Sequence, residues 1–167
     1  MTVRVGLISD THGLLRPEAV AALEGVDAIV HAGDVGAPGL LAELGAVAPV
    51  TAVRGNVDLG AWAERLPPTA ELELAGRWLH VLHRLDDLEL DPAAAGFDVV
   101  IFGHSHRPSI ERRKGVLYVN PGSAGPRRFH LPVTVGLLEL DSRRVRARSI
   151  TLVESGLPPR AAGGGGP

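Results

Sequence analysis

The sequence predicts an α/β fold in which two β-sheets pack face to face and helices lie outside them. In the first half, short apolar runs alternate with helical patterns, which is typical of strands joined by crossover helices. In the second half, apolar segments are joined by tight turns, which indicates hairpins. Polar residues follow the ends of several apolar runs, and α/β sheets form their sites at the carboxyl ends of strands.

The first half reads as strand, helix, strand, helix and strand. Segments 3–9, 27–31 and 49–53 are short apolar runs of a length suited to buried strands. Segment 17–24 has a proline at its start and alanine and leucine at helical spacing, and segment 39–44 is a shorter helical pattern. This order is the pattern of an α/β sheet.

The second half reads mainly as hairpins. Segment 69–74 alternates polar and apolar residues, and a glycine turn leads from it into segment 77–83. A helix is expected over 86–95, and a buried strand at the centre of the apolar run 97–102. The sequence at 120–123, Asn-Pro-Gly-Ser, fits a type II turn. Further strands are expected at 109–113, 116–119, 134–140 and 145–153.

Length and composition narrow the class of protein. The 167 residues predict one domain at 1–155 and a flexible tail rich in glycine and proline at 156–167. The absence of cysteine excludes disulfides, thiolate ligands and a cysteine nucleophile. A net charge of −2 gives no general attraction to nucleic acid. Without a signal-peptide pattern or a long apolar span, a cytoplasmic protein that does not enter membranes is expected.

Residues of metal-ligand type follow five of the predicted strands. In an extended segment residues two apart point the same way, so Asp10 with His12, and His104 with His106, could each face one spot. The ordinary alternative for Asp10 is a turn or capping residue. Two carboxylates, one carboxamide and four imidazoles suit two metals that share a bridging carboxylate, and without thiolates they fit manganese, iron, zinc or nickel. The candidates are Asp10, His12, Asp34, Asn56, His83, His104 and His106.

The motifs Asp10-x-His12, Gly33-Asp34, Gly55-Asn56, His83 and Gly103-His104-x-His106 resemble those of the calcineurin-like metallophosphoesterases. The resemblance covers about residues 3–153, and length and spacing look most like the compact bacterial and archaeal phosphodiesterase branch. It implies a four-layer αββα sandwich of the metallo-dependent phosphatase type, with two packed mixed sheets flanked by helices.

The resemblance also implies a ligand set and an activity. Asp10, His12 and His106 would hold one metal, Asp34 would bridge, and Asn56, His83 and His104 would hold the second. Manganese is the first expectation for both ions, with nickel, iron or zinc as alternatives. The expected reaction is hydrolysis of a small phosphodiester by in-line attack of a hydroxide that bridges the two ions.

Other residues are assigned from this reading. Asp34, Asn56 and His104 are the expected catalytic residues, with Asn56 among the donors that stabilise the equatorial oxygens. Asp58 is expected to orient an imidazole ligand, or else to be a structural residue after a turn. Many relatives have a histidine where this chain has Val57, and the compact branch typically lacks it.

Several basic side chains remain. Arg84 stands where relatives usually have glycine, and it either points to solvent or holds a phosphate through its planar donor fork. Arg127 and Arg128 either steer an anionic substrate or are ordinary surface residues. The second role is favoured. The other histidines are expected to be supporting or peripheral: His31 in the core or behind a ligand, His80 in packing and His130 in solvent.

Three rival functions are weighed against a diesterase. A phosphomonoesterase could use the same centre. A non-catalytic interaction scaffold, like the retromer subunit that shares this fold, would not require all seven ligand positions to be filled. A nucleic-acid-processing enzyme is disfavoured, because no basic stripe with interleaved aromatic residues is present. A small phosphodiester is therefore the expected partner, and a homo-oligomer is compatible with the sequence.

Overall fold

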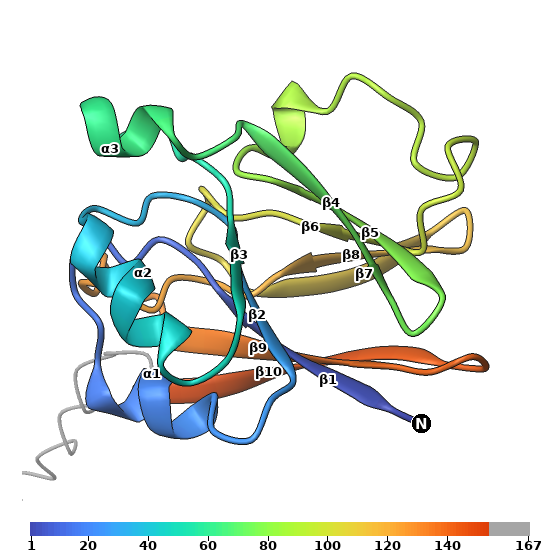
Figure 1. Cartoon of the computed structure of the whole chain (residues 1–167), viewed down its shortest axis with the longest axis horizontal. Coiled ribbons are helices and arrows are strands. Elements are labelled where there is room, and N and C mark those ends of the chain that lie inside the picture. The colour runs from blue at the N-terminus through green and yellow to red at the C-terminus, as the bar shows by residue number, and fades with distance from the viewer. Residues whose placement is uncertain (154–167) are drawn as a thin grey trace, which may run out of the picture.

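The computed structural model describes residues 1–153, and the predicted tail at 156–167 lies outside the described residues. Two five-stranded sheets pack face to face (Figure 1). This confirms the predicted α/β class with two packed mixed sheets. In the described part of the chain, no helix is long and apolar enough to span a membrane.

The first sheet has the strand order β10-β9-β1-β2-β3. Strands β1, β2 and β3 run parallel to one another, and β3 is at one edge. Strands β9 and β10 add an antiparallel hairpin beside β1. The bounds are β1 Val3–Ile8, β2 Ala28–His31, β3 Val50–Ala52, β9 Val133–Leu140 and β10 Val145–Val153. The crossover helices are α1 Pro17–Ala22 and α2 Pro38–Gly45, and each begins with proline, which is preorganised for the first helical turn.

The second sheet has the strand order β4-β5-β6-β8-β7. Its central strands β5, β6 and β8 are parallel, and hairpins add β4 and β7 at the two edges. The bounds are β4 Thr69–Leu74, β5 Arg77–Leu82, β6 Val99–Ile101, β7 Ser109–Arg113 and β8 Val116–Asn120. Gly122, which follows β8, has a φ of 77°, the left-handed value that the predicted type II turn needs at its third position.

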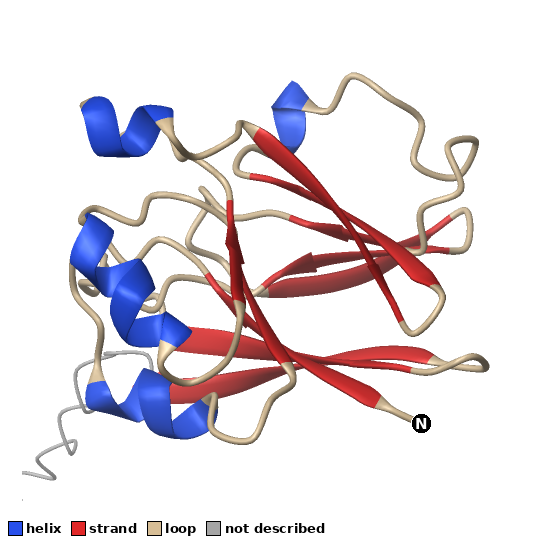
Figure 2. Ribbon diagram, in the orientation of Figure 1, coloured by secondary structure: helices blue, strands red, loops and turns tan. Residues whose placement is uncertain are grey.

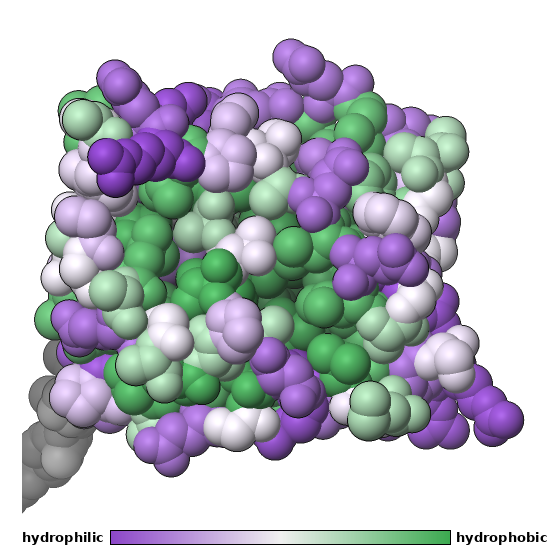
Figure 3. All heavy atoms as spheres, in the orientation of Figure 1, coloured by the Kyte–Doolittle hydropathy of each residue, from purple (hydrophilic) through white to green (hydrophobic). Residues whose placement is uncertain are grey.

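The core lies between the sheets because alternate residues of each strand point inward. Val5 and Leu7 of β1 share one buried cluster with Leu79 and Val81 of β5. In Figure 3, hydrophobic side chains cross the middle of the face that carries β3 and β4, and hydrophilic ones gather at its rim. Burial of these inward faces is the main force that holds the two sheets together.

Helices cover mainly the first sheet (Figure 2). Leu23 beside α1 and Leu40 and Leu44 of α2 pack against Ile8 and Ile29, on the outer face of that sheet. A further one-turn helix, α3 Ala61–Glu64, was not expected from the sequence. A helix of four residues is too short to show a helical repeat of apolar positions.

The predicted helix over 86–95 is wrong. The chain forms a single 3-10 turn, η1 Leu85–Asp87, and then irregular turns. Pro92 disfavours helical backbone at Asp91, whose carboxylate instead accepts the Ala93 N–H at 3.1 Å. This loop, rather than an α-helix, covers the outer face of the second sheet, where side chains of the loop pack on Leu82 and Val100.

Candidate metal centre

The predicted ligand residues follow strands whose carboxyl ends lie at one end of the sandwich, away from the N-terminus (Figure 1). Asp10 and His12 follow β1, and Asp34 and Asn56 follow β2 and β3. His83 follows β5, and the pair His104 and His106 follows β6. Within each sheet these strands are parallel neighbours, so their carboxyl ends lie at the same edge.

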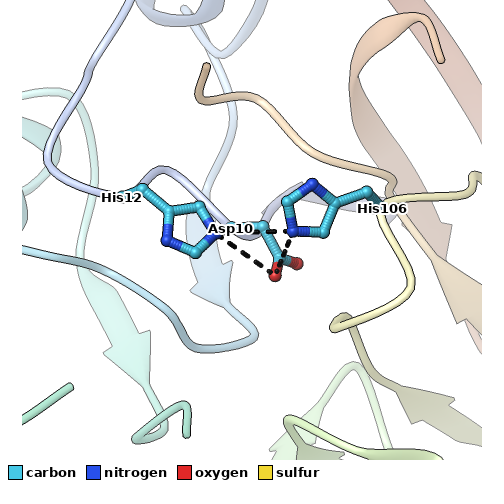
Figure 4. A group of neighbouring side chains, drawn as sticks. All are labelled: Asp10, His12 and His106. Atoms are coloured by element: carbon cyan, nitrogen blue, oxygen red, sulfur yellow. Dashed lines mark hydrogen bonds and ion pairs between the residues drawn. The ribbon is translucent and has the colours of Figure 1, made fainter. Parts of the chain in front are cut away.

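Asp10, His12 and His106 form the first cluster, with ligand atoms all within 4.8 Å of one another. Figure 4 shows the two imidazoles on either side of the carboxylate, with their Nε2 atoms turned toward it. His106 Nε2 lies 3.2 Å from Asp10 Oδ1 and 3.4 Å from His12 Nε2. His12 Nε2 lies 3.9 Å from the same Asp10 oxygen. Three ligand atoms from two distant segments therefore converge on one point.

Asp34, His83 and His104 form the second cluster, within the same limit of 4.8 Å. His83 Nε2 lies 3.1 Å from Asp34 Oδ2, and both side chains are buried. His104 is exposed, and its Nδ1 lies 3.0 Å from Asn56 Oδ1. Asn56 therefore joins this cluster at its solvent side.

The two carboxylates connect the clusters. Asp34 Oδ2 lies 3.8 Å from His12 Nε2 of the first cluster, in addition to its contact with His83. Asp10 Oδ1 in turn lies 3.9 Å from His83 Nε2 of the second cluster. The arrangement is one continuous set of ligand atoms rather than two separate sites.

Each carboxylate has one oxygen held by the protein and one turned into the site. Asp10 Oδ2 accepts the Ser9 hydroxyl at 2.6 Å and the His104 N–H at 3.1 Å, whereas Asp10 Oδ1 has no hydrogen-bond partner. Asp34 Oδ1 accepts the Val57 N–H at 3.0 Å. The inward oxygens are thus oriented before any ion arrives.

His83 is oriented in the same manner. Its Nδ1 donates to the Ala32 carbonyl at 2.7 Å, which directs the lone pair of Nε2 toward Asp34. The buried Nε2 atom has no hydrogen-bond partner of its own. A buried polar atom without a partner is costly, so the site is built for a further group.

The charges suit a cation. Burial alone would raise the pKa of Asp10, but the adjacent His106 imidazole and the hydrogen bond from Ser9 outweigh it and the pKa is lowered. Burial likewise opposes the lowered pKa of Asp34, which follows from the adjacent His83 imidazole and the hydrogen bond from the Val57 amide.

The imidazoles respond in opposite directions. Burial lowers the pKa of His12 despite the nearby carboxylates. Burial also acts to lower the pKa of His83, yet the adjacent carboxylates of Asp34 and Asp10 raise it overall. Metal ligation requires neutral imidazoles, so the lowered pKa of His12 favours metal binding and the raised pKa of His83 opposes it.

The residues fit divalent transition-metal ions. Two ligand atoms that are each about 2.1 Å from one ion are roughly 3.0–3.4 Å apart at octahedral or tetrahedral angles. The contacts of 3.1, 3.2 and 3.4 Å fall in this range. Imidazole nitrogen with carboxylate and carboxamide oxygen, and no thiolate, is the donor set of manganese, iron, nickel or zinc.

The backbone differs from the extended segments expected at the paired motifs. Asp10, His12, Asp34, His104 and His106 all have positive φ, between 47° and 70°. Left-handed backbone is rare outside glycine and concentrates at functional sites. It turns His104 toward the second cluster and His106 toward the first, so the expectation that this pair faces one spot is wrong.

Glycines permit the close approach of these loops. A Cβ at Gly103 would collide with Ser9 Oγ and Asp10 Oδ2, and a Cβ at Gly55 would collide with the Asp34 backbone and carboxylate. The Gly-His and Gly-Asn motifs are therefore steric requirements of a site in which a loop packs directly on a ligand.

Asp58 has the structural role that was one of its two expected roles, and the other expectation, that it orients an imidazole, is wrong. Its buried carboxylate accepts the N–H groups of Val35, Gly36 and Gly55 at 3.1, 2.9 and 2.9 Å. It therefore ties the loop after β2 to the loop after β3, and it acts on Asp34 and Asn56 only through their backbone.

His31 and His80 have the predicted supporting places. His31 is fully buried, and its Nδ1 accepts the Gly33 N–H at 3.1 Å, so Nε2 is the protonated nitrogen that donates to Thr11 Oγ1 at 2.9 Å. Burial lowers the pKa of His31 to about 4. His80 packs on Phe97, with ring centroids 5.1 Å apart, on the outer face of the second sheet.

The loop that carries Arg127, Arg128 and His130 is exposed, as predicted. The positive charge of Arg128 nevertheless contributes to the lowered pKa of His12.

Two supporting residues were not identified from the sequence. Ser9 holds Asp10, and Asn120 donates to the Gly103 carbonyl at 3.0 Å. Ser9 could have been noticed because it is a polar residue directly before the ligand Asp10. For Asn120 the sequence indicated only the turn at 120–123.

Comparisons with known proteins agree with this geometry. The sequence profile of the calcineurin-like phosphoesterase superfamily domain matches residues 3–143. A probable metallophosphoesterase of Methanothermobacter thermautotrophicus is 34% identical over 166 residues, which cover 92% of this chain and 94% of the relative.

Solved structures share the fold. An archaeal phosphodiesterase superposes with a TM-score of 0.74 at 27% identity, over 89% of this chain and 99% of the other. Vacuolar protein sorting 29 of Entamoeba histolytica, solved in complex with zinc, superposes with a TM-score of 0.69 at 18% identity, over 90% and 99% of the two chains. This second likeness shows the fold alone. The chain belongs to the calcineurin-like phosphoesterase superfamily.

Proposed function

We propose that this protein is a metal-dependent phosphodiesterase that hydrolyses small phosphodiesters at a dinuclear centre. The observation that carries the proposal is the pair of ligand clusters joined through Asp34 and Asp10. Asp10, His12 and His106 would hold one ion, Asn56, His83 and His104 the other, and Asp34 would bridge. When bound, two divalent ions, manganese first among them, would supply Lewis acidity and a nucleophile at neutral pH.

The exposed members of the second cluster meet the substrate. His104 and Asn56 lie at the solvent side, where polar hydrogens of the Asn56 carboxamide can donate to a phosphoryl oxygen. The buried carboxylates Asp10 and Asp34 stay ionised and would offset part of the charge of two divalent ions. Val57, which is half-exposed beside Asn56, offers no proton, so a leaving group that departs as a stable anion is favoured.

A diester is preferred to a monoester because there is room for a second ester arm. A cavity of about 500 Å³ adjoins the second cluster, with Asn56 and His83 in its wall. The scaffold alternative is favoured only by the fold shared with vacuolar protein sorting 29.

Metal-stripped protein titrated with manganese, nickel, zinc and magnesium tests the proposal. We expect two ions per chain and metal-dependent hydrolysis of bis(p-nitrophenyl) phosphate, with slower hydrolysis of p-nitrophenyl phosphate. His104→Ala should abolish turnover, whereas His80→Gln, on the outer face of the second sheet, should retain it. Absence of both metal binding and turnover would exclude the enzyme and favour the scaffold.

A further inference from the structure

The cavity beside the second cluster has a mixed lining. Leu82 and Pro68 contribute apolar surface, while Arg54 and Arg84 contribute guanidinium groups. Its volume of about 500 Å³ is within the range of roughly 300–1,000 Å³ that is usual for small-molecule sites. A group bound there would lie directly beside the second cluster, because His83 lines the cavity and also belongs to that cluster.

Arg84 borders the second cluster on two sides. It lines this cavity, and it also lines a smaller one of about 150 Å³ that has His104 in its wall. Its backbone is fixed, because its carbonyl accepts the Asp87 N–H at 3.1 Å and the carbonyl of His83 accepts the Gly103 N–H at 2.9 Å. The side chain therefore starts from a fixed point at the mouth of the site.

The guanidinium groups are available to a ligand. Arg84 Nε lies 3.9 Å from Asp87 Oδ2, and with side chains 43% and 66% exposed this ion pair is weak. Arg54 is half-buried, and none of the ion pairs among residues 1–153 includes it. A half-buried cation without a carboxylate partner favours an anion from outside.

The carboxylates of the cavity do not cancel this preference. Asp87 and Glu89 also line it, so the formal charges balance. Asp87, Glu89 and Arg84 are exposed and therefore screened by solvent, whereas Arg54 is half-buried. The positive charge of Arg54 is consequently the least screened of the four charges that line the cavity.

We propose that Arg54 and Arg84 form a substrate subsite for a negatively charged ester arm, one that ends in a carboxylate or a second phosphate. The inference rests on the proposed function, because the phosphoryl group at the metal centre places the arm. The planar guanidinium fork matches both oxyanions through paired hydrogen bonds. Arg84 and Arg54 are thus residues that determine specificity, while the reaction itself proceeds at the clusters.

Charge selectivity among p-nitrophenyl diesters tests the subsite. The second arm would be phenyl, carboxyphenyl, phosphophenyl or choline, with the same leaving group throughout. We expect kcat/KM for the two anionic arms to exceed that for phenyl by about fivefold to tenfold at low salt, and the choline diester to be poorest. Comparison of carboxyphenyl with phosphophenyl identifies the preferred oxyanion.

Variants assign the selectivity to the two arginines. Arg54→Gln and Arg84→Gln should each remove most of the preference, chiefly by raising KM for the two anionic diesters. Arg84→Glu should reverse the preference toward choline, and Arg148→Gln, on the exposed side of β10, should behave as the unaltered protein. An anionic preference that persists in both Gln variants, or equal kcat/KM for all arms, would overturn the inference.

Binding measured without turnover separates this inference from the proposed function. Calorimetry would compare two non-hydrolysable phosphonate monoesters, one with a phenyl arm and one with a carboxyphenyl arm. Tighter binding of the carboxyphenyl compound, lost in Arg54→Gln, supports the subsite even if no diester is hydrolysed. Equal affinity for the two compounds refutes it even if the enzyme turns over.

Discussion

Acidification is expected to destabilise the protein through His31. This imidazole is fully buried, and its Nδ1 accepts the Gly33 N–H, so a proton on that nitrogen would break the bond and leave a buried charge. Burial accordingly holds the pKa of His31 at about 4 in the folded protein, against an ordinary value of 6.5. His31 contacts Thr11, which is the residue between the two expected ligands Asp10 and His12 in the sequence.

The sign follows from proton linkage. Because the folded state binds fewer protons than the unfolded chain, His31 stabilises the fold above its unfolded pKa of 6.5, and this stability is lost as the pH falls toward 4. The difference between the unfolded and folded pKa values of His31 predicts a loss of roughly 2–3 kcal/mol in the free energy of unfolding between about pH 7 and about pH 4.5.

Urea unfolding of chelator-treated protein, followed by the fluorescence of Trp62 and Trp78, measures this loss. His31→Gln retains a carbonyl that can accept the Gly33 N–H but does not titrate. The variant should start less stable by about 1–2 kcal/mol near neutral pH and should lose roughly 2 kcal/mol less than the unaltered protein on acidification. If the two proteins lose the same free energy over this pH range, the assignment of the acid sensitivity to His31 is refuted.

Three further predictions concern the loops of the site. Asp58→Ala leaves three backbone N–H groups without their acceptor, and we expect a loss of about 3 kcal/mol in urea unfolding together with weaker metal binding. Gly103→Ala should weaken metal binding by about tenfold or more in calorimetry, because its Cβ collides with an Asp10 oxygen. Gly45→Ala is its matched control, with nothing within 4 Å, and should not weaken binding. Val57→His should make the hydrolysis rate of aryl diesters less dependent on leaving-group pKa, and an unchanged slope would contradict our account of that position.

The fold was predictable wherever periodicity was long enough. The strands of both sheets lie within one or two residues of their expected positions, because most of them carry a clear apolar or alternating pattern. The segment around Pro92 failed because its alanines suggested a helix while the proline and the carboxylate of Asp91 stabilised turns. The one-turn helix Ala61–Glu64 carried no repeat to read.

Sequence alone determined the chemistry of the site: which side chains can ligate, and that glycines accompany Asp34, Asn56 and His104. Tertiary structure decided how these side chains are grouped. Left-handed backbone divides His104 and His106 between two clusters, and Asp58 serves the loops rather than a ligand. It also placed Arg54 and Arg84, far apart in the chain, in one cavity. The physical reason is that ligand type is a property of a residue, whereas convergence depends on the packing of two sheets and on loop dihedral angles that no local pattern encodes.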